Sequence, residues 1–271
     1  MDPSIPIPTQ EYNLDPEAVS SYLKRLEELN PIVSGAVKKI IDGTYVVHFK
    51  HFLELLDAAV EAFMDTMTDN YIVCISALDK SEMWVVRLIN HLHPELELEL
   101  NRNVFLIKDL PELEVENVVI FDDGSFSGIH MINMVENIKS IVDVNVYIVT
   151  GLTTNTAINH LMDIIPEENV YFGKLLTTKV GGDEEYGLLN PDEIDAIKSF
   201  YRLEDGDNSL EDFYPVFFDH KMPGVFSSVP FIYAGLIPTD DGWEENPLIS
   251  GCEKGSYLKC PPVPYRSNTS N

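Results

Sequence analysis

The sequence predicts an α/β fold in which a parallel β-sheet is flanked by helices. Between residues 70 and 176, short apolar runs rich in β-branched residues alternate with segments of helical periodicity. This alternation is typical of parallel strands joined by helical crossovers. One apolar run, residues 118–121, ends abruptly in two acids and a group of small residues, so polar chemistry is expected at the carboxyl end of a buried strand.

Residues 1–68 are predicted to form an N-terminal helical extension. Asp15 is a suitable N-cap, Pro16 suits the first helical position, and Gly43 is expected to stop the second helix. The expected elements are a Pro-rich lead over residues 1–14, helices over 16–29 and 31–42, a β-branched segment over 44–49 and a helix over 51–67.

Residues 69–178 are predicted to form the α/β core, and residues 179–271 an acidic segment followed by a C-terminal hood or tail packed on that core. Right-handed crossovers place the carboxyl ends of parallel strands on one edge, and ligands bind there where the strand order reverses. The expected strands are 71–76, 104–107, 118–121, 144–150 and 170–176, and the expected helices are 81–93, 129–141, 157–165 and 191–200.

Residues 117–130 carry the clearest chemical signal. Backbone N–H groups of a small-residue turn and a helix N-terminus attract phosphate, while paired carboxylates accept hydrogen bonds from vicinal hydroxyls or hold Mg²⁺. An ordinary strand-to-helix turn with an Asp cap is the alternative. After the apolar strand come, in order, Asp122, Asp123, Gly124, Ser125, Phe126, Ser127 and Gly128, and an amphipathic helix begins at Ile129.

This stretch resembles the motif by which type I phosphoribosyltransferases bind 5-phosphoribosyl 1-diphosphate (PRPP), and the resemblance implies a Rossmann-like core of that family. It implies that Asp122 and Asp123 bind the ribose 2′- and 3′-hydroxyls, directly or with Mg²⁺. Residues 125–128 and the Ile129 N–H would then hold the 5′-phosphate. His130 departs from the pattern, because the family usually has Thr or Ser there.

A second loop follows the first strand of the predicted core. In type I phosphoribosyltransferases this loop binds pyrophosphate, largely through backbone N–H groups and a nearby Lys or Arg. The resemblance therefore implies that Lys80, together with Asp122 and Asp123, takes part in catalysis. A plain helix start at Ser81 and Glu82 is the alternative. The implied PRPP-binding residues of this loop are Ala77, Leu78, Asp79, Lys80 and Ser81.

Enzymes of this family also carry a flexible loop before the phosphate-loop strand, which closes over the transition state. Between His93 and Val118 this chain offers only a short strand and residues 108–112, with Arg102 and Lys108 as candidate pyrophosphate ligands. The segment is too short for a separate lid. Its length favours, as the alternative to an enzyme, a sensor that binds PRPP or a nucleotide without turnover.

The C-terminal third contains Asp219, His220 and Lys221, which offer an acceptor, a proton donor and a cation as a candidate hood over the base site. A surface salt-bridge set is the alternative. Fragments here resemble phosphoribosyltransferase-like domains of bacterial conflict and anti-phage loci, which implies a defence-system partner protein. Cys252 and Cys260 could join His220 around a metal, but their spacing matches no zinc motif.

The chain is strongly acidic, with 18 Lys and Arg against 45 Asp and Glu and a formal net charge of −27. Such a surface repels nucleic acid, and any anion site must be focused locally by backbone dipoles, Mg²⁺ and a few cations. No apolar run approaches the ~20 residues that span a bilayer, and no signal peptide is expected. Three cysteines, one in an apolar run at Cys74, do not suggest a disulfide framework, so a cytoplasmic location is expected.

These expectations converge on a phosphoribosyltransferase that binds PRPP with Mg²⁺, transfers the phosphoribosyl group to a nitrogenous base and releases pyrophosphate. Family habit implies a homodimer. A sensor without turnover and an interaction component of anti-phage defence are the alternatives.

Overall fold

A computed structural model of the chain describes residues 13–67, 70–181, 187–203, 210, 213–218, 230–239 and 242–248. These residues form two compact units, one of residues 50–177 and the other of residues 13–49 with the described residues from 178 on. This division differs from the three consecutive segments expected. The first two helices share one hydrophobic core with the C-terminal third, whereas nearly all of the third helix belongs to the α/β unit.

The α/β unit contains a five-stranded parallel sheet of order β3-β2-β4-β5-β6, which confirms the predicted class. The chain runs from β2 outward to β3 and then returns to place β4 on the other side of β2. The strand order therefore reverses between β2 and β4. The strands are β2 (Ile72–Ile75), β3 (Val104–Leu106), β4 (Asn117–Ser125), β5 (Asn145–Thr154) and β6 (Val170–Leu176).

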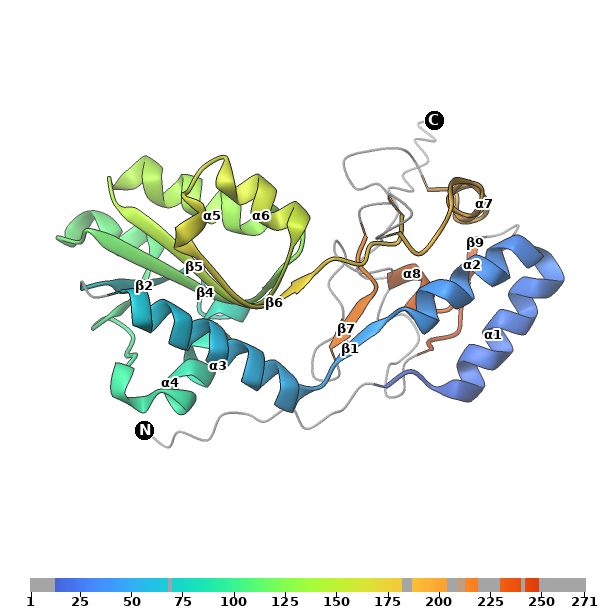
Figure 1. Cartoon of the computed structure of the whole chain (residues 1–271), viewed down its shortest axis with the longest axis horizontal. Helices are drawn as coiled ribbons and strands as arrows, with labels where there is room; N and C mark the ends of the chain where they lie inside the picture. The colour runs from blue at the N-terminus through green and yellow to red at the C-terminus, as the bar shows by residue number, and fades with distance from the viewer. Residues whose placement is uncertain are drawn as a thin grey trace, which may run out of the picture. The chain divides into compact units, whose positions relative to one another are not determined.

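Helices cover both faces of this sheet, with α5 and α6 on one face and α3 and α4 on the other (Figure 1). On the α5 face, Met134 and Val135 pack with Val118 and Ile120 of β4. On the opposite face, Phe63 of α3 contacts the ring of Phe121 edge-on. The helices are α3 (Phe49–Thr66), α4 (Ser81–Leu92), α5 (Ile129–Ile141) and α6 (Asn155–Met162), with short 3₁₀ turns η1 (Pro94–Leu96), η2 (Ile107–Glu112) and η3 (Glu167–Asn169).

Strand β4 continues four residues beyond the predicted end at Phe121. Asp122 pairs with Thr150 and Ser125 with Thr153, because β5 is also longer than expected and keeps the same register. The acid pair and the two residues after it therefore belong to the strand, and only Phe126 to Gly128 form the connection to α5. Since side chains alternate along a strand, Asp122 lies on the α5 face and Asp123 on the α3 face.

The second unit begins with two helices whose predicted bounds are confirmed, α1 (Pro16–Leu29) and α2 (Pro31–Asp42). The Asp15 side chain accepts hydrogen bonds from the first turn of α1, and Asn30 both ends α1 and caps α2. Each helix has a proline at its first position, where the missing N–H costs nothing. Local sequence therefore determines both helix starts.

The rest of this unit joins distant parts of the chain. Tyr22 of α1 donates a hydrogen bond to the carbonyl of Leu236 and also contacts the Tyr201 hydroxyl. All three residues lie in one buried core. The remaining elements are β1 (Tyr45–Val47) parallel to β7 (Val216–Phe218), α7 (Pro191–Tyr201), α8 (Pro230–Tyr233), and β8 (Leu236–Thr239) antiparallel to β9 (Gly242–Glu245). No helix among the described residues is long and apolar enough to cross a bilayer.

Candidate functional site

The N-cap residues of the helices that follow β2 and β4 supply no side-chain cap, although Ser127 Oγ accepts a hydrogen bond from the Ile129 N–H at 3.4 Å. At the start of α4 the N-cap residue is Lys80, and at the start of α5 it is Gly128; neither makes a side-chain capping hydrogen bond. By contrast, Asp15, Asn30, Thr154 and Asn190 cap α1, α2, α6 and α7. The first N–H groups of a helix need acceptors, and an anion can supply them. These two helix starts lie on either side of the strand-order reversal, where α/β sheets bind ligands.

The connection between β4 and α5 is held by its carbonyl oxygens. The Ser125 carbonyl accepts from Thr153 Oγ1 at 3.2 Å, the Phe126 carbonyl from Thr154 Oγ1, and the Ser127 carbonyl faces His160 Nδ1 at 2.9 Å. Three successive carbonyls are thus engaged by β5 and α6. Carbonyl oxygens repel a phosphate, so their engagement elsewhere favours an anion at this turn.

Gly128 is required by the geometry of this turn. Its φ of 80° lies in the left-handed region, which residues with a Cβ rarely adopt. An added Cβ would also lie 3.1 Å from the Ala157 carbonyl oxygen and 3.2 Å from its Cα. The glycine therefore allows α6 to approach the start of α5 closely.

Asp122 and Asp123 are each 4% exposed. They sit at the carboxyl end of β4, beside the strand-order reversal, as the sequence predicted, but inside the strand rather than in a turn. A carboxylate in such a position loses hydration and is stabilised by the hydrogen bonds it accepts. A carboxylate can accept several such bonds, so hydroxyl groups of a ligand are suitable additional donors.

A polar cluster that the sequence reasoning missed lies at the same edge. His130 Nε2 is 2.8 Å from Glu82 Oε1, and Ser76 Oγ donates to the same oxygen at 2.8 Å. Ser76 follows β2, Glu82 lies in the first turn of α4 and His130 in the first turn of α5. Glu82 is fully buried, whereas the His130 side chain is 53% exposed. The sequence predicts Glu82 only as part of a plain helix start, because an acid in the first turn of a helix is an ordinary feature.

The hydrogen bonds of this cluster shift the pKa values of both partners. Burial alone would raise the pKa of Glu82, but hydrogen bonds from His130, from Ser76 and from the backbone N–H of Glu82 outweigh it and leave that pKa below the usual 4.5. The hydrogen bond to Glu82 raises the pKa of His130 above 6.5, against the effect of burial, and the charge of Asp122 adds to the rise. Lys80 opposes it, so its ammonium group acts on this same site.

The Glu82–His130 contact is therefore expected to stabilise the fold most between pH 4.5 and 6.5. The raised pKa of His130 gives a contribution that is complete below pH 6.5 and is lost as pH rises through the folded-state value. The lowered pKa of Glu82 gives a contribution to stability that is complete above pH 4.5 and is lost as pH falls through the folded-state pKa. The melting temperature of wild type minus that of Glu82→Gln, measured from pH 3 to 9, should peak in this window; a flat difference would contradict the assignment.

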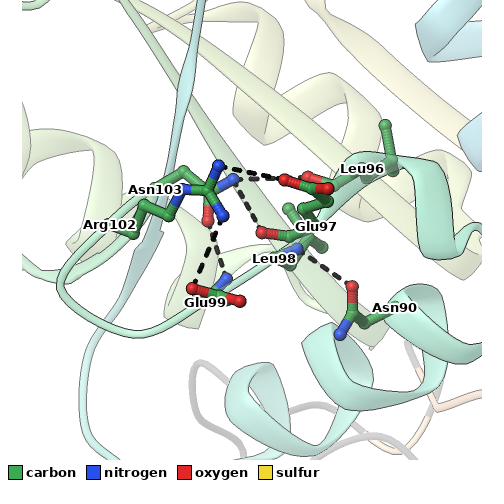
Figure 2. A network of polar contacts seen from close by, with 7 residues as sticks. All are labelled: Asn90, Leu96, Glu97, Leu98, Glu99, Arg102 and Asn103. Atoms are coloured by element: carbon green, nitrogen blue, oxygen red, sulfur yellow. Dashed lines mark hydrogen bonds and ion pairs between the residues drawn. The ribbon is translucent and has the colours of Figure 1, made fainter.

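Arg102 does not lie at this edge. Its guanidinium pairs with Glu97 at 3.0 Å and with Glu99 at 3.6 Å, in a loop that Asn103 braces through the carbonyls of Leu96 and Glu97 (Figure 2). This loop precedes β3 and so lies at the amino ends of the strands. The expectation that Arg102 reaches a pyrophosphate is wrong, because a parallel sheet separates its two edges. Lys108, which follows β3 in η2, stays at the carboxyl edge and is exposed.

The segment between β3 and β4 contains no lid, and it is described throughout. Its 3₁₀ turn η2 is packed into the core on the α5 face through Ile107 and Leu110. Cys74 lies in the same core as predicted, and burial raises the pKa of its thiol to about 12.

Several predicted residues lie outside the described residues, namely Asp219, His220, Lys221, Cys252 and Cys260. Within the described ranges no group of three or more His, Cys, Asp or Glu side chains could hold a metal ion. The chain matches no protein-family model, and no curated protein or solved structure matches it significantly. Fold and site together define an α/β protein with a five-stranded parallel sheet, at whose strand-order reversal polar side chains gather at the carboxyl edge.

Proposed function

We propose that this edge binds PRPP and that the protein is a type I phosphoribosyltransferase-like enzyme. The observation that carries the proposal is the pair of helix starts, α4 and α5, whose N-cap residues supply no side-chain cap. They lie on either side of the strand-order reversal, and two buried carboxylates stand at the end of β4. PRPP has a phosphate, a diphosphate and a vicinal diol. Two helix starts and an acid pair complement these three groups.

In the proposed complex the start of α5 and residues 126–128 hold the 5′-phosphate. Asp122 and Asp123 accept hydrogen bonds from the ribose hydroxyls, and Lys80 with the start of α4 binds the diphosphate. Because the described residues offer no preformed three-ligand metal group, Mg²⁺ would bind mainly through diphosphate oxygens. The wider acidic surface makes this local concentration of donors necessary.

The proposed reaction replaces the C1–O bond of PRPP with a C1–N bond. The electron pair of the breaking bond leaves with pyrophosphate, the lone pair of the base nitrogen forms the new bond, and a proton carried by that nitrogen is released to water. Positive charge develops on the ribose ring while negative charge develops on the leaving group. Fixed N–H dipoles and Lys80 would stabilise the leaving group, and the acid pair would position the ribose.

Binding without turnover is a second candidate, favoured by one observation. The segment in which the family carries its mobile loop is occupied here by η2, whose Ile107 and Leu110 are buried in the core. Closure over the transition state would have to come from another part of the chain. A PRPP sensor needs the same phosphate and ribose contacts but no such closure.

Thermal unfolding with PRPP and Mg²⁺ tests the binding proposal. A ligand that binds only the native state stabilises it by about 2.7 kcal/mol at a concentration of 100 times Kd. We expect a rise in melting temperature with PRPP–Mg²⁺ and none with ribose–Mg²⁺, which lacks both phosphate groups. No rise at saturating PRPP would contradict both candidates. Pyrophosphate release across a panel of purine and pyrimidine bases then separates the enzyme from the sensor.

A further inference from the structure

The His130–Glu82 contact determines which nitrogen of the imidazole can meet a ligand. Nε2 faces Glu82 Oε1 at 2.8 Å, and Ser76 Oγ donates to that same oxygen. An ionised carboxylate accepts hydrogen bonds and cannot donate, so Nε2 must carry a proton. The remaining nitrogen, Nδ1, is on a side chain that is 53% exposed. It has no hydrogen-bond partner among the described residues.

Protonation of His130 therefore changes the character of Nδ1. In the neutral ring Nδ1 bears a lone pair, which repels a phosphate oxygen. In the imidazolium Nδ1–H is a charge-assisted donor on a residue of the first turn of α5. The family usually has Thr or Ser at this position, and a hydroxyl can donate at any pH. His130 would replace that hydroxyl with a donor that is present only when the imidazole is protonated.

We propose that His130 binds the phosphate of the ligand through Nδ1–H only when its ring is charged, and that Glu82 is the positioning residue that holds the ring. This inference rests on the proposed phosphate site at the start of α5. The ligand class is thereby narrowed to phosphate monoesters, whose dianion pairs well with an imidazolium. Binding of such a ligand must be accompanied by uptake of up to one proton.

Three charged side chains and one helix dipole act on His130. Glu82 from α4 and Asp122 from β4 favour the charged ring, whereas Lys80 from the loop after β2 disfavours it. The N-terminal dipole of α5 also disfavours a cation. A bound phosphate reverses the last effect by covering the helix start with negative charge. The ring is therefore expected to become more basic when the site is occupied.

Calorimetric titration with ribose 5-phosphate between pH 6.5 and 8.5 tests the proposal. In wild type we expect the affinity to fall with rising pH by up to about tenfold per unit, with proton uptake seen as a dependence of the enthalpy on the buffer. His130→Thr restores the family's hydroxyl and should remove the His-dependent part of this fall. Glu82→Gln keeps the imidazole but should move the fall to lower pH. His91→Gln, an exposed histidine on α4, is the matched control and should behave as wild type.

The outcomes separate this inference from the proposed function. If His130→Thr has the same pH profile as wild type, the inference is overturned while the site stands. If ribose 5-phosphate does not bind wild type at any pH, both the inference and the proposed function fail.

Inorganic pyrophosphate probes the other helix start, at α4. The ratio of its affinity for wild type to its affinity for His130→Thr should therefore stay near one. A pH-dependent ratio with pyrophosphate alone would place His130 at the diphosphate and also overturn the inference. Should Glu82→Gln fail to fold, Ser76→Ala is the substitute, because it removes one hydrogen-bond donor to Glu82 and retains the Glu82 carboxylate. This variant should change the pH dependence of ribose 5-phosphate affinity.

Discussion

Replacing Gly173 with alanine is expected to destabilise the α/β unit by more than about 3 kcal/mol, the upper end of the usual cost of overpacking. Gly173 lies in β6 directly against the backbone of α3. A Cβ there would lie 2.0 Å from the carbonyl oxygen of Leu55, 2.5 Å from its carbonyl carbon and 2.7 Å from its Cα. No side-chain rotation relieves a clash with backbone, so α3 must move away from the sheet.

Denaturant unfolding, followed by circular dichroism, measures this effect. Gly35→Ala in α2 is the matched control, because nothing lies within 4 Å of its added Cβ. Alanine is favoured over glycine in a helix interior by about 0.5–1 kcal/mol, so the control should be stabilised. Equal midpoints for Gly173→Ala and wild type would show that α3 is not packed on β6 as described.

The double variant Asp122→Asn, Asp123→Asn is expected to abolish the PRPP-dependent rise in melting temperature and leave the fold intact. Asparagine has nearly the same shape as aspartate, so the packing at the end of β4 should survive. Its amide lacks the negative charge and one of the acceptor oxygens that ribose hydroxyls need. Hydrogen bonds to charged groups contribute about 1.5–3 kcal/mol, so each single variant should weaken binding by roughly 10- to 100-fold.

The control for this pair is Asp143→Asn. Asp143 is exposed and lies just before β5, at the amino edge of the sheet. Its substitution changes the net charge by the same amount as either single variant but should leave binding unchanged. If the double variant binds PRPP as tightly as wild type, the carboxylates do not hold the ribose.

The bounds of α1, α2 and α5 were predictable because they depend on neighbours in the chain. Asp15 and Asn30 cap the turns directly after them, and Gly128 takes the positive φ that starts α5. Apolar runs likewise identified all five strands of the sheet. In each case the determining atoms lie within a few residues of one another, so the sequence pattern contains them.

The end of β4 was predicted four residues too early for a different reason. Asp122 to Ser125 have poor strand preference, and their extended conformation comes from pairing with β5, about 28 residues further on. Arg102 was misplaced because a basic residue in a loop does not reveal which edge of the sheet the loop is on. Only the strand direction shows that this loop lies at the amino edge of the sheet, away from the candidate site. There Arg102 pairs with Glu97 and Glu99.

The sequence by itself determined the α/β class, the helix starts and the position of the acid pair, because hydrophobic period and local capping are short-range properties. Tertiary structure alone decided that α4 and α5 start on either side of the strand-order reversal, and that Glu82 and His130, 48 residues apart, meet at 2.8 Å. The protonation of His130 depends on that contact. Long-range pairing sets which charges become neighbours in a low-dielectric environment, and no local pattern encodes it.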